Sequence, residues 1–255
     1  MLLAVDVGNT HTVIGMYVGE NRIADWRITT RKERTADELG VLITNLFQSH
    51  GAIGAPTVTR AIVSSVVPAL TDTVVRMVRQ LFDVRCRIVG PGLKTGMPIR
   101  YEDPREVGAD RIVNAVSAYA RHQSGLIIVD FGTATTFDVV SPKGEYLGGA
   151  ICPGIGISSE ALFHHAARLP RVEFARPSQV VGRNTVSSIQ SGLVFGYVSM
   201  IEGMVKRIET EIDFPCSVGA TGGLASNIAR ETEIIDWVDE WLTLDGLRVL
   251  SDLNP

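Results

Sequence analysis

The sequence predicts an α/β protein made of two duplicated lobes. Along the whole chain, segments with the residue pattern of β-strands alternate with segments that have helical periodicity. This order is typical of α/β folds. A second observation is an apolar strand-and-turn motif that occurs twice: residues 2–12 read LLAVDVGNTHT, and residues 126–136 read LIIVDFGTATT. The length of 255 residues suits two lobes of similar size. We expect an N-terminal lobe over residues 1–122 and a C-terminal lobe over residues 123–255.

The two copies of the motif align residue by residue at a separation of 124 positions. The alignment pairs Asp6 with Asp130, Gly8 with Gly132, Asn9 with Thr133 and Thr12 with Thr136. A strand that runs into a glycine turn presents backbone N–H groups and hydroxyls that can bind phosphate oxygens. An Asp at the strand end can hold a divalent cation, because hard cations prefer oxygen ligands. Either turn alone could be an ordinary hairpin entry, but the duplication favours two facing phosphate loops and predicts a phosphoryl-transfer cleft.

The elements of the first lobe follow from its pattern. A hairpin is expected first, then a helix that starts at the capping sequence TADE, then alternating strands and helices. A Gly- and Pro-rich stretch reads as a long loop before the last helix. The expected elements are strands at 1–7, 12–18 and 22–29, a helix from residue 36, a strand at 61–67, a helix at 70–82, a strand at 86–89, a loop at 90–108 and a helix at 109–122.

The second lobe repeats the hairpin and then continues with helices. A long helical pattern interrupted by small residues is its most extended feature, and a helix is expected to close the chain. The expected elements are strands at 126–140 with a turn inside and at 145–150, a helix from 153 to about 167, helical periodicity over 185–208, a strand at 217–221, a helix from 224 and a helix at 237–253.

Composition excludes several classes of protein. The net charge of −4 and the lack of a long Lys/Arg run argue against a nucleic-acid-binding surface. No apolar stretch has transmembrane length, and the start of the chain lacks the basic region of a signal peptide. Three scattered cysteines show no metal-binding spacing, so we expect reduced thiols in a cytoplasmic protein.

Two further motifs are candidate binding sites. The run Ala220-Thr221-Gly222-Gly223 lies between a strand and a helix, where glycines let a flat ring approach the backbone. Alone it is more often a tight connection, but after two phosphate turns it fits an adenosine-binding turn.

The run Gly108-Ala109-Asp110-Arg111 lies where the long loop becomes a helix. Asp110 could merely favour the helix start, or it could accept a proton from a substrate hydroxyl while Arg111 binds a carboxylate. A P-loop is excluded, since no Gly-x-x-x-x-Gly-Lys-Ser/Thr run occurs.

With these motifs in place, the chain resembles the type III pantothenate kinases, which belong to the acetate kinase, hexokinase and actin superfamily. The resemblance covers essentially the whole chain and rests on four ordered motifs: Asp6-Val7-Gly8-Asn9-Thr10 with Gly15, Gly108-Ala109-Asp110-Arg111, Asp130-Phe131-Gly132-Thr133-Ala134 and Thr221-Gly222-Gly223. It implies two actin/ribonuclease-H-like lobes, each a mixed sheet flanked by helices, with a nucleotide cleft between them.

The resemblance also implies an activity and its residues. The expected reaction is ATP-dependent phosphorylation of the primary hydroxyl of pantothenate to 4'-phosphopantothenate, the first step of coenzyme A biosynthesis, with Asp110 as proton acceptor. The implied ATP-binding residues are Asp6, Val7, Gly8, Asn9, Thr10, His11, Thr12, Val13, Thr133, Gly222 and Gly223. The implied pantothenate-binding residues are Tyr101, Gly108, Ala109, Asp110, Arg111 and Thr185. Nothing local marks Tyr101 or Thr185 as a ligand.

Cofactors and partners follow from the same resemblance. Asp6 would lie near Mg²⁺, directly or through water, and Asp130 would lie at a monovalent-cation site for K⁺ or NH₄⁺. A cation is physically reasonable, because the first loop contains no lysine to neutralise the transferred phosphoryl group. Thr185 would reach the pantothenate pocket of the neighbouring subunit, which implies a homodimer. We expect neither nucleic acid nor membrane as a partner.

Two other functions stay open at this point. The first keeps the fold but changes the substrate, to another small-molecule kinase or a polyphosphatase; Asp110, Arg111 and Thr185 weigh against it. The second is a nucleotide-sensing regulator derived from a kinase, since the family resembles some proteins described as transcriptional activators. The presence of Asp110 weighs against a purely regulatory role.

Overall fold

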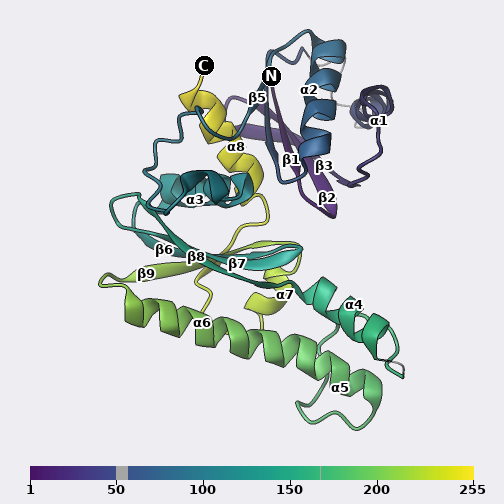
Figure 1. Cartoon of the computed structure of the whole chain (residues 1–255), viewed down its shortest axis with the longest axis vertical. Coiled ribbons are helices and arrows are strands. Elements are labelled where there is room, and N and C mark those ends of the chain that lie inside the picture. The colour runs from purple at the N-terminus through teal and green to yellow at the C-terminus, as the bar shows by residue number, and fades with distance from the viewer. Residues whose placement is uncertain (50–56, 167) are drawn as a thin grey trace. The chain divides into compact units, whose positions relative to one another are not determined.

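The structure is a computed structural model that describes residues 1–49, 57–166 and 168–255 (Figure 1). Its chain divides into two compact units. The first contains residues 1–121 together with 242–255, and the second contains residues 122–241. Each unit has its own five-stranded sheet.

The sheet of the first unit is mixed. Its strand order is β3-β2-β1-β4-β5, with β1 antiparallel to β2 and parallel to β4. The strands are β1 (Leu2–Val7), β2 (His11–Val18), β3 (Asn21–Thr29), β4 (Arg60–Ser65) and β5 (Cys86–Ile88). The hairpin and both later strands lie where the sequence predicts them, to within a few residues at their ends.

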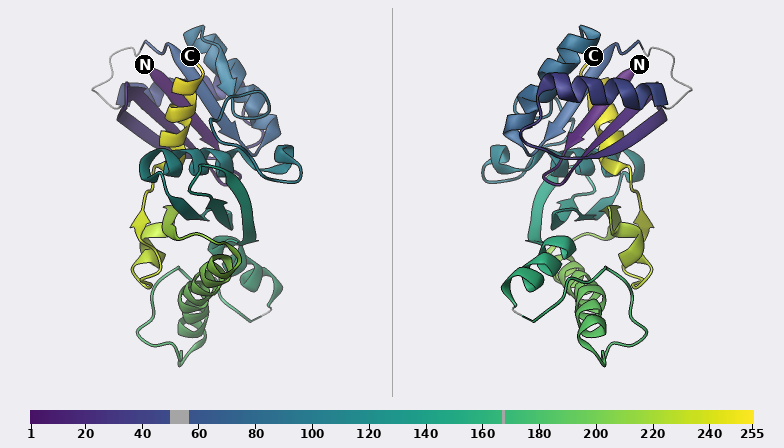
Figure 2. Two further views of the ribbon diagram at one scale, coloured as in Figure 1. Left: turned by 90° about the vertical axis from the view of Figure 1, so that its left-hand side faces the viewer. Right: turned by 90° about the vertical axis from the view of Figure 1, so that its right-hand side faces the viewer.

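Helices cover both faces of this sheet. Leu3, Val5 and Val63 point into a core shared with the first two helices, whereas the residues between them face the last helix. Figure 2 shows the last helix in front of the sheet in one view and the first helix in front in the opposite view. The helices of this unit are α1 (Ala36–Ser49), α2 (Pro68–Phe82), a short 3₁₀ turn η1 (Pro104–Glu106), α3 (Ala109–His122) and α8 (Leu242–Leu253).

The predicted capping sequence at the start of α1 is confirmed. Thr35 donates its N–H to the Glu38 carboxylate at 2.8 Å, and the N–H of Glu38 donates to the Thr35 hydroxyl at 3.2 Å. These reciprocal bonds satisfy N–H groups that a helix start leaves without partners. The hydrogen bonds that the N–H and the hydroxyl of Thr35 donate to the Glu38 carboxylate lower the pKa of this exposed carboxyl, with a smaller contribution from nearby arginines. The cap therefore fixes where the chain turns from β3 into α1.

The end of the chain differs from the sequence-based expectation. Residues 237–253 do not form one helix: Trp237–Val238 is a short strand, β10, and α8 begins only at Leu242. The sequence-based division placed residues 242–255 in the C-terminal lobe, whereas α8 packs on β1, β2 and β4 of the first unit. Leu247 and Leu250 are completely buried there. An amphipathic pattern predicts that a helix buries one face, but not which sheet it covers.

The second unit repeats the first. Its strand order is β10-β9-β6-β7-β8, and its central strand is antiparallel to the next strand along the chain and parallel to β9. The strands are β6 (Gly125–Phe131), β7 (Ala134–Val140), β8 (Tyr146–Pro153), β9 (Cys216–Gly222) and β10 (Trp237–Val238). In this order β6 corresponds to β1, β7 to β2, β8 to β3 and β9 to β4. The predicted pair of duplicated lobes with mixed sheets is confirmed.

Helices of the second unit pack on a core that includes Ile127, Val129 and Ile201. The predicted helical stretch from residue 185 is one continuous ribbon (Figure 1), with a π-helical turn at its small residues. The helices are α4 (Ile155–His165), α5 (Thr185–Ser191), η2 (Gly192–Gly196), α6 (Tyr197–Glu211) and α7 (Ala225–Ala229). Residue 167, where we expected the first of them to end, lies outside the described residues. Among the residues described, no helix has both the length and the apolar character needed to cross a bilayer.

Candidate active site

The first phosphate-loop candidate is a tight hairpin between β1 and β2. Residues 8–10 connect the strands, and the N–H of Gly8 donates to the carbonyl of His11 at 3.0 Å. Asp6 is half-buried near the end of β1, where it pairs with Val13 on one side and Ser64 on the other. Asn9 and Thr10 are exposed at the tip. The predicted residues 6–13 therefore comprise one compact turn and the strand ends that flank it, with polar groups at the tip and a carboxylate nearby.

This turn is held from the side by Thr30, the residue that follows β3. The N–H of Thr30 donates to the carbonyl of Thr10 at 3.0 Å, and the Thr30 hydroxyl donates to the carbonyl of Gly8 at 2.8 Å. The hydroxyls of Thr30 and Thr12 are 2.9 Å apart and hydrogen-bonded. We did not predict Thr30 as part of the site. Its position directly after a strand that pairs with β2 is the signal that could have identified it.

The second phosphate-loop candidate is one residue shorter. Only residues 132–133 connect β6 to β7, and the N–H of Gly132 donates to the carbonyl of Ala134 at 3.0 Å. The N–H of Gly154, directly after β8, donates to the carbonyl of Thr133 at 3.1 Å. Thr133 is exposed at this tip.

The difference in loop length corrects part of the sequence alignment. Thr12 pairs with Val7 next to the first loop, and Thr135 pairs with Phe131 next to the second. Thr12 therefore corresponds in structure to Thr135, not to Thr136 as the constant separation suggested. The alignment holds up to each turn and shifts by one residue beyond it, because the extra residue lies inside the first turn.

The predicted adenosine-binding turn lies against the second loop. Thr221 on β9 pairs with Asp130 on β6, and Gly222 pairs with Phe131. Gly222 has a φ of +92°, and a Cβ atom there would be 2.6 Å from Oδ1 of Asp130. A glycine is therefore required on both conformational and steric grounds. The structure thus brings together Asp130 and Gly222 from two motifs separated in sequence.

The loop-to-helix junction places Asp110 in the first turn of α3. Its Oδ1 accepts the N–H of Arg111 at 2.8 Å, and a Cβ atom on Gly108 would be 2.6 Å from that oxygen. Burial raises the pKa of the Asp110 carboxyl, while the hydrogen bond and the charge of Arg111 act in the opposite direction. Arg111 is itself buried, at 7% exposure. A buried carboxyl beside a buried arginine makes Asp110 and Arg111 candidates for a functional site. Tyr101 is half-buried in the loop before η1.

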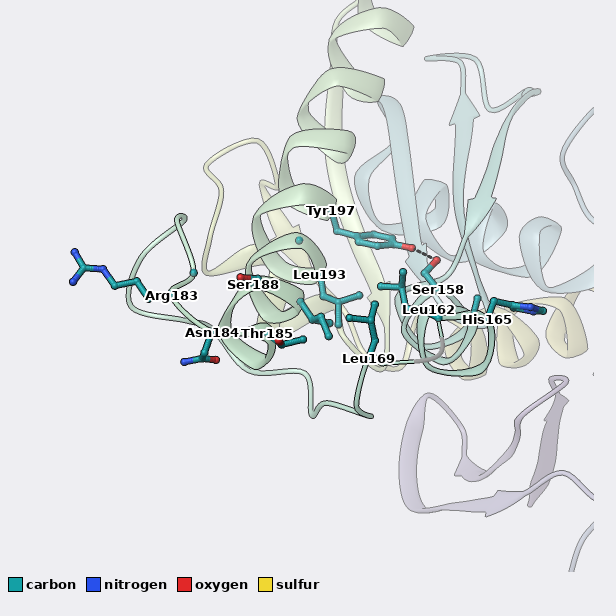
Figure 3. Close-up of a pocket in the computed structure, with 15 residues that line it drawn as sticks. Ser158, Leu162, His165, Leu169, Arg183, Asn184, Thr185, Ser188, Leu193 and Tyr197 are labelled. Atoms are coloured by element: carbon teal, nitrogen blue, oxygen red, sulfur yellow. Dashed lines mark hydrogen bonds between the residues drawn. The ribbon is translucent and has the colours of Figure 1, made fainter.

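Thr185 lies in the second unit, at the start of α5. Asn184 caps this helix: its Oδ1 accepts the N–H of Ser187 at 2.9 Å. Thr185 is exposed and lines a groove of about 1140 Å³ between α4 and α5, with apolar side chains such as Leu162 and Leu193. In Figure 3, Tyr197 and Ser158 are joined by a hydrogen bond across this groove, while Arg183 extends away from it. Within the second unit, Thr185 therefore belongs to an apolar surface groove rather than to the phosphate loop.

Comparison with known proteins identifies the family. The model of the type III pantothenate kinase family matches residues 2–207. The chain belongs to the type III pantothenate kinase family. A curated type III pantothenate kinase from Myxococcus xanthus is 59% identical over 254 residues, covering 100% of this chain and 99% of the relative. The family member from Geobacter sulfurreducens is 54% identical over 254 residues, again covering 100% and 99%. The resemblance inferred from the four motifs is confirmed.

Solved structures support the fold of this kinase family. A conserved putative Baf family transcriptional activator from Campylobacter jejuni superposes with a TM-score of 0.64 at 17% identity, covering 99% of this chain and 98% of the other. A putative 2-dehydro-3-deoxygalactonokinase from Sinorhizobium meliloti gives a TM-score of 0.60 at 13% identity, with both chains covered completely. At these identities the likeness concerns the fold, and it agrees with the duplicated lobes described above.

Proposed function

We propose that this chain transfers a phosphoryl group from ATP to the primary hydroxyl of pantothenate, giving 4'-phosphopantothenate in the first step of coenzyme A biosynthesis. The observation that carries the proposal is the match to type III pantothenate kinases along the whole chain, at up to 59% identity in the relatives described. The geometry supports the proposal with two turns closed by main-chain hydrogen bonds, a glycine turn beside the second of them, and a carboxylate at the start of α3.

In this proposal the two loops bind the phosphates of ATP. Residues 6–13 form the first loop and Thr133 contributes from the second, both at tight turns with polar groups at the tip. Gly222 and Gly223 would contact the adenosine, because glycines let a flat ring approach the backbone. Preorganised N–H groups stabilise developing negative charge without reorganisation during the reaction. Tight closure of both turns by main-chain hydrogen bonds supports this role.

Asp110 is the proposed proton acceptor for the pantothenate hydroxyl. A general base works best when its pKa lies closer to the working pH than that of a free carboxylate. Burial moves the pKa of Asp110 in that direction. The buried guanidinium of Arg111 would bind the pantothenate carboxylate, with Tyr101, Gly108 and Ala109 lining the same pocket.

Two cations complete the proposed site. Mg²⁺ commonly binds one or two carboxylates together with substrate phosphates, which fits Asp6 beside the first loop. The carboxylate of Asp130 lies beside the second loop and would contribute to a site for K⁺ or NH₄⁺. These cations would neutralise charge on the phosphates, while the chain itself orients the nucleotide through loop N–H groups.

The active enzyme is proposed to be a cytoplasmic homodimer, with Thr185 entering the pantothenate pocket of the neighbouring subunit. The groove beside Thr185 supports this, since apolar side chains such as Leu162, Leu169 and Leu193 line it. Val180 and Val181 nearby in sequence are 64% and 77% exposed. Apolar surface of this kind is typical of a protein–protein contact.

The proposed substrate can be tested by measuring ADP release with pantothenate and with a panel of other small alcohols, with and without K⁺. Preference for pantothenate in kcat/KM supports the proposal. A stronger preference for another alcohol would identify a different small-molecule kinase, and hydrolysis of inorganic polyphosphate would indicate the polyphosphatase. Nucleotide binding without turnover on any substrate would favour the regulatory alternative.

A further inference from the structure

We infer that Thr30 is a positioning residue for the first phosphate loop: its hydroxyl holds the loop in the shape that binds nucleotide. The inference rests on the proposed use of this loop for ATP, and it extends that proposal to a residue on a different strand. Thr30 follows β3 and lies outside residues 6–13. It nevertheless contacts the loop at Gly8, Thr10 and Thr12.

The donor and the acceptor can be assigned in both hydrogen bonds of the Thr30 hydroxyl. A carbonyl can only accept, so the single hydroxyl hydrogen of Thr30 is used at Gly8, 2.8 Å away. Thr12 must then be the donor in its 2.9 Å bond to Thr30. The hydroxyl hydrogen of Thr12 therefore points back to Thr30 and is not available to a phosphate oxygen. Thr12 is 5% exposed, as expected for a side chain that shapes the loop from beneath.

The second unit lacks the hydroxyl contacts that Thr30 makes in the first unit. The position equivalent to Thr30 is Gly154, where a Cβ atom would lie only 2.1 Å from the carbonyl oxygen of Thr133. No side chain fits at Gly154, so no hydroxyl can reach the second loop from this position. Thr135, the structural counterpart of Thr12, is completely buried, and its hydroxyl has no hydrogen-bond partner in the described structure. The hydroxyl chain from Thr12 through Thr30 to Gly8 is thus specific to the first unit.

Loop length gives the physical reason for the difference. The shorter second turn closes with two main-chain bonds and close backbone packing against Gly154. The first turn has three connecting residues instead of two, and each added residue has backbone freedom that must be lost when the loop orders. A side-chain bond to the carbonyl of Gly8 restrains that added freedom. Preorganisation of a binding loop raises affinity by lowering this entropic cost.

The test compares Thr30→Val, which keeps the shape and removes the hydroxyl, with Thr30→Ser, which keeps the hydroxyl. Thr44→Val is a matched control, because the Thr44 hydroxyl donates to the carbonyl of Gly40 at 2.9 Å inside α1, away from the loop. Two quantities are measured on each purified chain: the Kd of ADP with Mg²⁺ by calorimetry, and amide hydrogen exchange of peptides that cover residues 7–13.

We expect Thr30→Val to weaken ADP binding about tenfold, equivalent to about 1.4 kcal/mol, and to speed exchange in residues 7–13. Thr30→Ser should stay within about threefold of the wild type, and Thr44→Val should change neither quantity. Wild-type affinity and wild-type loop exchange in Thr30→Val would overturn the inference, as would equal losses in Thr44→Val. If Thr30→Val does not fold, Thr30→Ala, which also removes the hydroxyl, decides: faster loop exchange than in Thr30→Ser is expected, and equal exchange in the two variants would overturn the inference.

The two proposals fail in different ways. A wild-type chain that binds no ADP contradicts the proposed function. Loop exchange in the unliganded variants still reports on Thr30 in that case, because it requires no ligand.

Discussion

Thr30 and Gly154 occupy equivalent positions in the two units. Each directly follows the third strand of its sheet, and each donates its N–H to a phosphate-loop carbonyl, at 3.0 Å to Thr10 and at 3.1 Å to Thr133. The main-chain contact is therefore retained in both repeats, while the side chain differs. In the first unit a hydroxyl extends into the loop, and in the second the backbone itself fills that space.

Gly154→Ala should disrupt the second loop, because the added methyl group would lie 2.1 Å from the oxygen and 2.7 Å from the carbonyl carbon of Thr133. We expect a destabilisation of about 1–3 kcal/mol, as for overpacking elsewhere, together with weaker ATP binding. Urea denaturation and the KM for ATP measure the two effects. Gly156→Ala is the control, since nothing lies within 4 Å of its Cβ position. Equal stability of the two variants would contradict this prediction, because it would show that the second loop can move away from the added methyl group without loss of stability.

Asp110→Asn should fold and lose catalysis by about 10²–10⁴-fold if Asp110 is the proton acceptor. In the wild type, kcat/KM for pantothenate should rise with pH through an apparent pKa above the ordinary Asp value, because burial raises the pKa of this carboxyl. Steady-state kinetics across pH check both statements. Turnover near that of the wild type in the purified variant would remove Asp110 from the chemical step.

The same carboxyl affects stability with a definite sign. A pKa raised by folding means that the folded chain binds the proton more tightly than the unfolded chain. The stability gained is present at low pH and is lost as pH rises from the ordinary Asp value through the raised pKa. Asp110→Asn carries no such titration, so its unfolding free energy at neutral pH should equal or exceed that of the wild type. A clear loss of stability at neutral pH would instead identify Asp110 as a helix-start residue.

Asp6 and Asp130 occupy corresponding strands but are expected to serve different ions. Asp6→Asn should raise the Mg²⁺ concentration needed for half-maximal activity, whereas Asp130→Asn should mainly reduce activation by K⁺. Each variant is titrated with each ion while the other is held constant. The same response in both variants would contradict the assignment of separate roles.

The fold was largely predictable because its signals are local. The hairpins, the cap at Thr35 and the repeated motif depend on residues close in sequence. The position of α8 depends instead on distant partners: the Tyr17 hydroxyl donates to Asp245 at 2.6 Å, and Arg121 forms an ion pair with the same carboxylate. Burial and the Asp245 carboxylate together raise the pKa of Tyr17. No periodicity in the sequence indicates such a network, so the helix was assigned to the wrong lobe.

The candidate site residues proposed from the sequence are those with local signals. Residues 6–13, Asp110, Asp130 and Gly222 each lie at or beside a turn with a characteristic residue pattern, and their roles in binding and catalysis stay predictions. Thr30 was missed, since its role comes from strand pairing rather than from a motif. The one-residue shift that pairs Thr12 with Thr135 was also missed, because a constant separation cannot reveal an insertion inside a turn.

A shared active site across a homodimer can be tested by complementation. Asp110→Asn and Thr185→Arg chains, each expected to be inactive alone, are mixed under conditions of subunit exchange. Because Thr185 would act in the partner's pocket, each heterodimer should contain one intact composite site, and activity should return. Native mass spectrometry confirms that exchange occurred. Exchange without recovered activity would contradict the shared site.

The most direct test of the account is identification of the product. Purified chain is incubated with ATP, Mg²⁺, K⁺ and pantothenate, and the reaction is followed by mass spectrometry. Formation of 4'-phosphopantothenate in equal amount to ADP is the predicted result, with loss of both in the Asp110→Asn variant. Release of ADP without a phosphorylated pantothenate, or the same product yield from Asp110→Asn, would contradict it.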